Sequence, residues 1–182
     1  MRNYFIIALV VIAAGFVSCD DGWKVFGTSE FSIEFPGPAQ DTVTMAGNIA
    51  GGRTYYEPAE RSLDSNLYYA VSMYTLPDSV SVLGKERDEF FQKDVQIYAW
   101  SIGGVLADNG RPVKSGAFEG REYKVTLEGN SGVATVRKFA YGRHLYTLLV
   151  VTNNMCLNNH AILRFMDSFK LKGGQEIPKE GK

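Results

Sequence analysis

The chain has 182 residues, 45% of them hydrophobic, and carries 19 Lys and Arg against 20 Asp and Glu. This length supports one domain with a sizeable core that needs neither a metal nor disulfides. The balanced charge, with no basic block and no acidic tail, excludes the electrostatic pattern of a nucleic-acid-binding protein, so we expect no nucleic-acid partner.

Residues 1–19 have the pattern of a bacterial export signal. Arg2 precedes an apolar run over residues 4–17, and a small serine stands directly before Cys19. The run is shorter than the roughly 20 residues that span a bilayer, which favours a cleaved signal over a membrane anchor. A Cys at the cleavage point is typical of a lipoprotein signal (a lipobox), although Phe16 occupies the position where Leu is usual.

We therefore predict that residues 1–18 are removed and that Cys19 carries lipid, with residues 19–23 as a short tether. Lipoprotein processing adds several acyl chains, and durable membrane anchoring needs two or more. The expected location is the bacterial cell envelope. Asp20 and Asp21 influence sorting differently in different bacteria, so the membrane and its leaflet stay open. An ordinary signal peptide and an uncleaved anchor are the alternatives.

The first half of the remaining chain favours short strands. Residues 31–35 alternate hydrophobic and polar side chains, which is typical of a half-buried strand, and the Pro-Gly-Pro that follows ends it. Residues 42–50 and 53–57 flank two glycines. We predict a hairpin with its turn at Gly51 and Gly52.

The periodicity changes after a strand predicted over residues 67–76. Residues 83–102 place apolar side chains on one stripe of an amphipathic helix, and the glycines at 103 and 104 are a typical C-terminal stop. The stripe consists of Phe91, Val95, Tyr98 and Ile102, with Phe90 and Ile97 beside it. We interpret this stripe as core rather than as a ligand site.

Three strands are predicted next, and two turns determine how they pair. A turn at residues 142–143 sets one register, and a turn at residues 129–132 sets the other. The predicted pairs are Ala140 with Leu145, Val136 with Leu149, Leu127 with Ala134, and Val125 with Val136. Both turns put these apolar residues on one face, although the second sets Lys124 opposite Arg137, a like-charge pair.

The last predicted element is a helix that starts near Asn158. Its apolar stripe consists of Ala161, Ile162, Phe165, Met166 and Phe169. His160 falls on the polar side, where we expect it to be solvated. A polar C-terminal tail over residues 172–182 follows a single domain over residues 24–171.

The other face of the three strands carries a candidate binding face. It consists of Arg137, Phe139, Tyr141, His144 and Tyr146. A planar cation among aromatic rings is favoured at recognition sites. The alternative interpretation is that a helix or loop covers this face, so that the rings are core and Arg137 extends to the edge. In the strands predicted before the first helix, the tyrosines are likewise either exposed for binding or buried in the core: Tyr55, Tyr56, Tyr68, Tyr69 and Tyr74.

Catalytic and metal-binding patterns are not recognisable in the sequence. The two histidines lack a third ligand at a suitable spacing, so we expect no metal and no cofactor. Cys156 and His160 lie four residues apart, but thiol catalysis also needs a group that orients the base. Once Cys19 is lipidated, Cys156 has no partner, and we expect it to be buried and inert. We therefore expect that the protein is not an enzyme.

The segment FSIEFPGPA at residues 31–39 follows shortly after the predicted lipid site. Strand pairs, a helix, three strands and a final helix come after it. This motif and this order resemble the PsbP-like superfamily, named for a photosystem II extrinsic subunit and shared by a nuclear-transport Ran-binding factor. The resemblance covers residues 24–171 and implies an α+β fold, an antiparallel β-sheet with helices packed on its faces (an α/β/α sandwich). The apolar run over residues 145–151 is typical of a central strand covered on both faces.

For function, the resemblance implies binding rather than catalysis, because characterised members mostly bind or help to assemble protein complexes. We therefore expect a lipid-anchored cell-envelope protein that presents a non-catalytic binding or assembly module to a protein partner. The alternative is a small-ligand or glycan-binding lipoprotein that uses the Arg137 face. In that case a pocket open to water should lie beside Arg137.

Overall fold

The computed structural model describes residues 22–46, 49–58, 66–77, 84–153 and 159–172. In this part of the chain the helices are α1 (Gly84–Ser101) and α2 (His160–Ser168), with a short 3-10 turn over Glu128–Asn130. The strands are β1 (Lys24–Gly27), β2 (Phe31–Phe35), β3 (Gln40–Ala46), β4 (Ile49–Tyr56), β5 (Asn66–Thr75), β6 (Val105–Leu106), β7 (Arg111–Ser115), β8 (Phe118–Thr126), β9 (Gly132–Tyr141), β10 (His144–Asn153) and β11 (Lys170–Leu171).

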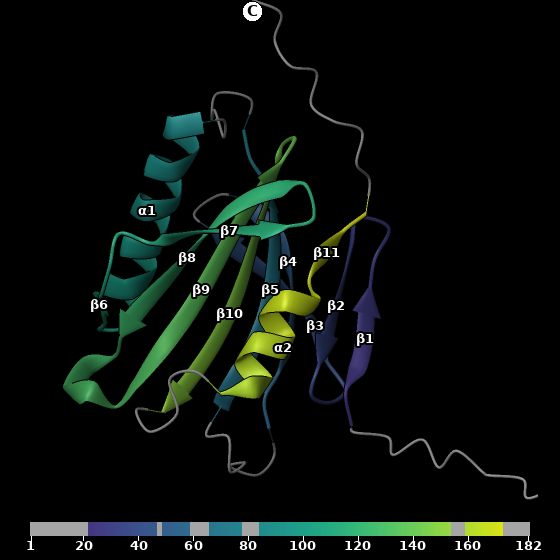
Figure 1. Cartoon of the computed structure of the whole chain (residues 1–182), viewed down its shortest axis with the longest axis horizontal. Helices are drawn as coiled ribbons and strands as arrows, with labels where there is room; N and C mark the ends of the chain where they lie inside the picture. The colour runs from purple at the N-terminus through teal and green to yellow at the C-terminus, as the bar shows by residue number, and fades with distance from the viewer. Residues whose placement is uncertain (1–21, 47–48, 59–65, 78–83, 154–158, 173–182) are drawn as a thin grey trace, which may run out of the picture.

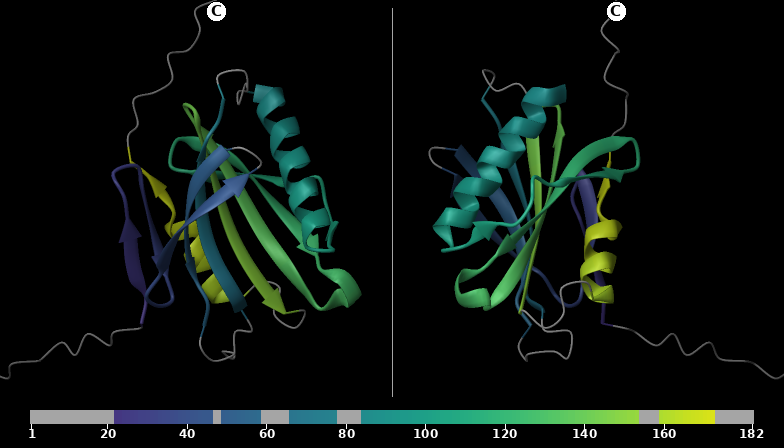
Figure 2. Two further views of the ribbon diagram at one scale, coloured as in Figure 1. Left: turned by 180° about the vertical axis from the view of Figure 1, so that it is seen from behind. Right: turned by 60° about the vertical axis from the view of Figure 1, so that its left-hand side comes forward.

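An antiparallel sheet of eight strands forms the middle layer, in the order β3-β4-β5-β10-β9-β8-β6, with β7 paired to β8 (Figure 1). Helix α1 lies on one face of this sheet. Helix α2 and a small sheet in the order β1-β2-β11 lie on the other face (Figure 2). The predicted α+β fold, an antiparallel sheet with helices on both faces, is confirmed. Neither α1 nor α2 is long and apolar enough to cross a lipid bilayer.

The central strand β10 contributes to two hydrophobic clusters, one on each face of the sheet. Tyr146, Leu148 and Val150 pack into the cluster beneath α2, which also contains Phe31, Ile33, Phe35, Phe165 and Phe169. The intervening Leu145 and Leu149 pack with the cluster beneath α1, which contains Phe91, Val95, Val125 and Val136. The prediction of a central strand covered on both faces is confirmed.

Helix α1 occupies nearly the range that the apolar periodicity predicts. Its buried residues are Phe91, Val95 and Ala99, whereas Tyr98 and Ile102 are only partly buried. The predicted stop is also confirmed. Gly103 has a φ of +65°, and the Gly104 N–H donates to the Ala99 carbonyl at 2.7 Å, which closes the last turn of the helix.

The turn predicted at Gly51 and Gly52 is wrong, because both glycines lie inside β4. Ala46 pairs with Ile49, so the chain reverses between these two residues. Gly51 pairs with Tyr74 of β5, and a Cβ at Gly51 would lie 2.5 Å from the Met73 carbonyl oxygen. The glycine thus allows β5 to approach β4 closely. A close approach of another part of the backbone is a common reason for a glycine within a strand.

Of the two predicted registers, the one between β9 and β10 is confirmed, since Ala140 pairs with Leu145 and Val136 with Leu149. The register between β8 and β9 is wrong by two residues, because Val125 pairs with Ala134. A shift of two keeps every side chain on its predicted face. It also removes the like-charge pair, since Glu122 rather than Lys124 stands opposite Arg137.

Helix α2 begins at His160, two residues beyond the predicted start near Asn158. All five residues of its predicted apolar stripe are buried: Ala161, Ile162, Phe165, Met166 and Phe169. The Asn159 side chain accepts a hydrogen bond from the Ile162 N–H at 3.0 Å, which caps the helix, and exchanges hydrogen bonds with the buried Asn66 of β5. This cap links the start of α2 to the sheet.

We expect Asn159→Ala to lower the free energy of unfolding by about 0.5–2 kcal/mol, because it removes the cap of α2. Urea unfolding of the full chain, followed by circular dichroism, measures this loss. His160→Ala is the matched control, since His160 is the next residue and its side chain is exposed. Equal losses for the two variants would contradict the assignment of the cap.

Candidate functional site

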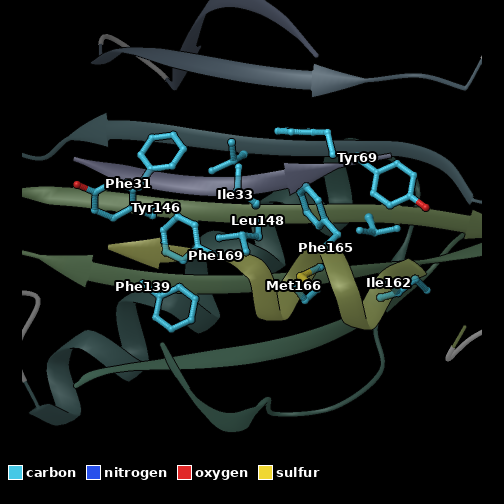
Figure 3. Packing of buried hydrophobic residues seen from close by; sticks show 13 residues of the cluster. Phe31, Ile33, Tyr69, Phe139, Tyr146, Leu148, Ile162, Phe165, Met166 and Phe169 are labelled. Carbon is cyan, nitrogen blue, oxygen red and sulfur yellow. The ribbon is translucent and has the colours of Figure 1, made fainter. Parts of the chain in front are cut away.

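The structure places two residues of the candidate face from the sequence in the core. Phe139 and Tyr146 are each 1% exposed and lie in the cluster beneath α2 (Figure 3). The Phe139 ring stacks on that of Phe169 with centroids 5.4 Å apart. The Tyr146 hydroxyl donates to Glu30 Oε2 at 3.0 Å. Burial and the Glu30 carboxylate raise the pKa of Tyr146, so this phenol is a neutral donor.

Arg137 and Tyr141 of the same face are also engaged within the domain. The Arg137 guanidinium forms ion pairs with Glu122 at 2.5 Å and with Asp167 of α2 at 2.6 Å. Tyr141 packs edge-on against Phe118 with centroids 5.0 Å apart. The structure therefore does not present the candidate face as one open surface. Helix α2 and the small sheet cover its centre, as in the alternative interpretation of the sequence.

The two histidines belong to different elements of the described part of the chain. His144 Nδ1 lies 3.3 Å from Thr75 Oγ1 at the edge of the same face, and His160 is exposed on α2. Cys19 and Cys156 lie outside the described residues. Among the residues that are described, no three His, Cys, Asp or Glu side chains are grouped so that they could hold a metal ion.

A different set of polar and aromatic residues lies on the α1 side of the sheet. Strand alternation directs Arg53 and Tyr55 of β4, and Tyr68, Ser72 and Tyr74 of β5, to this side. The rings of Tyr55 and Tyr68 stack with centroids 5.8 Å apart. Helix α1 packs mainly on β6, β8 and β9. The residues from β4 and β5 are therefore only partly covered, apart from the buried Ser72.

A cleft with a volume of about 260 Å³ separates α1 from this part of the sheet. We call it the α1 cleft. Its lining residues are Arg53, Ser72, Tyr74, Asp94, Val95, Ile97, Tyr98, Ser101, Val136, Lys138, Thr147 and Leu149. The cleft thus combines an apolar wall with several hydrogen-bonding groups and two cations.

One of these cations, Lys138, is already neutralised. The Lys138 side chain is 3% exposed, and its ammonium group donates to Thr147 Oγ1 at 2.7 Å. It also forms an ion pair with Asp94 of α1, whose side chain is 40% exposed. A buried ammonium group needs such partners because desolvation destabilises its charge. Lys138 therefore attaches α1 to the sheet and is not available to a ligand.

The other cation, Arg53, is only partly buried, and its charge is not compensated within the described part of the chain. Its Nε donates to Ser72 Oγ at 3.2 Å. Among the described residues, no carboxylate oxygen lies within 4.0 Å of the Arg53 guanidinium. The α1 cleft therefore has one positive charge in excess when Lys138 and Asp94 are counted as a pair.

Two tyrosines beside Arg53 are neutral hydrogen-bonding groups. Burial raises the pKa of Tyr68, although the charge and hydrogen bond of Arg53 act in the opposite direction. Burial likewise raises the pKa of Tyr98, against the charge of Arg53. Both phenols are therefore protonated at neutral pH, and Tyr98, which lines the cleft, can donate to an acceptor there.

Two large apolar side chains of α1 point to solvent. Ile97 is 61% exposed and Trp100 is 70% exposed. Residues three apart are neighbours on a helix surface, so the two side chains form one apolar ridge, and Ile97 also lines the α1 cleft. We call Ile97 and Trp100 the α1 ridge. Large apolar groups that stay exposed beside a polar cleft are typical of an interaction site.

Part of this site could be recognised from the sequence, and part could not. Tyr55, Tyr68 and Tyr74 were among the tyrosines whose exposure the sequence left open. Arg53 was missed because the preceding glycines were interpreted as a turn. The α1 ridge was missed because Ile97 was expected beside the buried stripe of the helix, whereas it is 61% exposed. The signal for the ridge was the Ile97–Trp100 spacing, on the side of the helix away from Phe91.

No protein-family model matches the chain, and no curated protein sequence matches it. Among solved structures, its fold is similar to the solution structure of cyanobacterial PsbP (CyanoP) from Synechocystis sp. PCC 6803. The TM-score is 0.58, over 89% of this chain and 99% of that chain. The sequence identity is 13%, so the likeness concerns the fold and not the activity. The chain therefore has the PsbP-like fold that segment 31–39 and the order of elements predict.

Proposed function

We propose that the chain is a lipid-anchored cell-envelope protein whose domain is a non-catalytic module that binds a protein partner. The partner binds at the α1 cleft and the α1 ridge. The observation that carries this proposal is the gathering of Arg53, partly exposed tyrosines and Trp100 on one side of the domain. Arg, Tyr and Trp dominate the residues that supply binding energy at protein interfaces.

Anchoring is supported by the sequence of residues 1–19, with lipid on Cys19. Only residues 20–23 separate Cys19 from the first strand, β1, and an extended chain spans at most about 3.3–3.6 Å per residue. A lipid on Cys19 would thus hold the domain close to the membrane surface. A bound partner would be held there too.

The non-catalytic part of the proposal is supported by the chemistry of the α1 cleft. The hydroxyl groups of Ser72, Ser101 and Thr147 line it, but His144 and His160 are not among its lining residues. A hydroxyl nucleophile needs a neighbouring base to take its proton. Lys138 does not serve as that base, because Asp94 holds its ammonium group in an ion pair.

The size of the cleft favours a side chain of a protein over a free ligand. Pockets for drug-sized ligands have volumes of roughly 300–1,000 Å³. The α1 cleft has about 260 Å³ and lies beside the exposed α1 ridge. A protein can fill the cleft with one side chain and cover the ridge with its neighbours. A glycan or small ligand at Arg137 is not supported, because this residue is only 6% exposed.

Site-specific photo-crosslinking in the envelope of the native bacterium tests the proposal. A photoreactive benzoylphenylalanine replaces Trp100 of the full chain, and in a second variant it replaces Leu163 of α2, which is 44% exposed on the opposite face. We expect the Trp100 variant to give one defined adduct, identified by mass spectrometry, which the Leu163 variant does not give. Adding Tyr98→Ala should reduce the adduct several-fold, since Tyr98 lines the cleft and such anchors contribute strongly to binding.

The anchoring part has its own readout. Cys19→Ser should move the protein from the membrane fraction to the soluble fraction. Identical adducts from the two positions, or no adduct at either, would show that the α1 side is not a binding surface. Retention of the Cys19→Ser variant in the membrane would contradict the lipid anchor.

A further inference from the structure

We infer that the group of the partner that enters the α1 cleft is a carboxylate, held by Arg53. This inference rests on the proposed function and specifies the chemistry of its contact. The proposed carboxylate belongs to an acidic side chain of a protein, which has an apolar residue beside it.

The first argument is the charge of the cleft. Within the described part of the chain, Lys138 and Asp94 neutralise each other, which leaves Arg53 as the uncompensated charge of the cleft. One negative charge on the partner would balance it. Within a partly buried site an ion pair is stronger than in water, because the effective dielectric constant is lower.

The second argument is the set of donors around Arg53. A guanidinium presents five N–H donors in a planar fork that matches a carboxylate. In Arg53 the Nε–H already donates to Ser72 Oγ. The neutral Tyr98 hydroxyl belongs to the same cleft. A carboxylate oxygen accepts from such donors, whereas an ammonium group would meet the like charge of Arg53. The cleft is therefore selective for an anion.

The third argument separates a carboxylate from a phosphate. A phosphate monoester carries roughly −1.5 to −2 charge at pH 7, and a carboxylate carries one charge. The single excess charge of Arg53 matches the carboxylate, and the half-exposed Asp94 lines the same cleft, where it would repel a second negative charge. The α1 ridge then provides a surface for an apolar neighbour of the acidic residue, since Ile97 belongs to both cleft and ridge.

Binding of short capped peptides to the full chain tests this inference. The probes are acetyl-Leu-Glu-Leu-amide, its Gln counterpart and its phosphoserine counterpart, titrated into the isotope-labelled protein in detergent and followed by NMR. A hydrogen-bonded charge is worth about tenfold to a hundredfold in affinity, so the Glu peptide should bind more tightly than the Gln peptide by that factor. The shifted resonances should come from the α1 cleft.

Variants of the protein isolate the role of Arg53. Arg53→Gln should remove the preference for Glu over Gln, and Arg53→Lys should keep part of it, because the charge stays while the fork is lost. Lys114→Gln is the matched control, since Lys114 is exposed on β7 and does not line the cleft, and it should leave the preference unchanged. Thermal unfolding confirms that each variant is folded.

The other outcomes overturn the inference. Equal affinity of the Glu and Gln peptides, or tighter binding of the phosphoserine peptide, would exclude a carboxylate contact. Butyrate that binds as tightly as the Glu peptide would assign the cleft to a free carboxylate. If no peptide binds but the Trp100 adduct forms, the carboxylate inference fails while the proposed function stands. If both are absent, the proposed function fails as well.

Discussion

Phe165→Ala is expected to lower the free energy of unfolding by about 3–5 kcal/mol, because it leaves a cavity in the core beneath α2. The Phe165 side chain is fully buried, and its ring meets those of Phe35 and Tyr69 at centroid distances of 5.2 and 5.3 Å. These rings come from three parts of the fold, namely α2, the small sheet and the large sheet. Native domains are stable by only about 5–15 kcal/mol, so this loss is a large fraction of the total.

Urea unfolding of the full chain measures the effect of Phe165→Ala. Leu163→Ala is the matched control, because Leu163 lies on the same helix but is 44% exposed. Surface substitutions of this kind usually change stability by less than about 0.5 kcal/mol. If the two variants lost the same stability, the contact of α2 with the sheet would not be the source of the loss.

The second large effect concerns the buried ion pair between Arg137 and Glu122. Arg137→Met keeps most of the apolar stem but removes the charge, and we expect it to cost about 3–5 kcal/mol. The reason is that the Glu122 side chain, 4% exposed, would keep only Arg111, which is 65% exposed. Adding Glu122→Gln to Arg137→Met should recover part of the loss, because no buried charge is then left without its partner.

The same pair predicts a dependence of stability on pH. Burial raises the pKa of Glu122, but the hydrogen bonds and charges of Arg137 and Arg111 outweigh it, so the net pKa lies below the ordinary value of 4.5. A carboxylate with a lowered pKa stabilises the folded state above its unfolded pKa, and this contribution is lost as the pH falls through the folded value.

We therefore expect wild-type stability to fall in part as the pH drops below 4.5, the ordinary pKa of the Glu122 carboxyl. In Arg137→Met, burial of Glu122 is less well compensated, so its pKa should rise and its share of this acid-induced loss should shrink. Urea unfolding between pH 3 and pH 7 gives the comparison. A double variant no more stable than Arg137→Met, together with unchanged pH profiles, would show that the ion pair is not coupled to folding.

The elements that the sequence predicts correctly are those whose pattern is local. The stripes of α1 and α2, the apolar run of β10 and the turn at residues 142–143 all depend on neighbours within a few residues. The register of β8 with β9 depends on the length of the intervening turn. Gly51 is needed for the close approach of β4 to β5, and its partner in β5, Tyr74, is 23 residues further along the chain. The spacing of residues around Gly51 does not reveal such a distant contact.

In the candidate site, too, local patterns are predicted correctly, whereas contacts between distant parts of the chain are not. Alternation predicts that Phe139 and Tyr146 share one face of the sheet, but whether this face is open depends on β2 and α2, which come from opposite ends of the domain. The openness of the face around Arg53 depends in turn on where α1 lies across the sheet (Figure 2). Chemical composition identified aromatic residues as candidates, and only the tertiary arrangement separated core from surface.

The pairing of β2 with β11 has a consequence for the order of folding. Phe31 near the start of the domain pairs with Leu171 at its end, so the small sheet can be completed only after the last strand has been synthesised. Contacts between residues so distant in sequence form slowly, because a long loop must close first. A nascent chain would thus keep the side chains of β2 without their β11 partner until residues 170–171 have been synthesised. Delayed burial of this kind is compatible with the export that is proposed above from residues 1–19, because an unfolded chain is easier to move across a membrane.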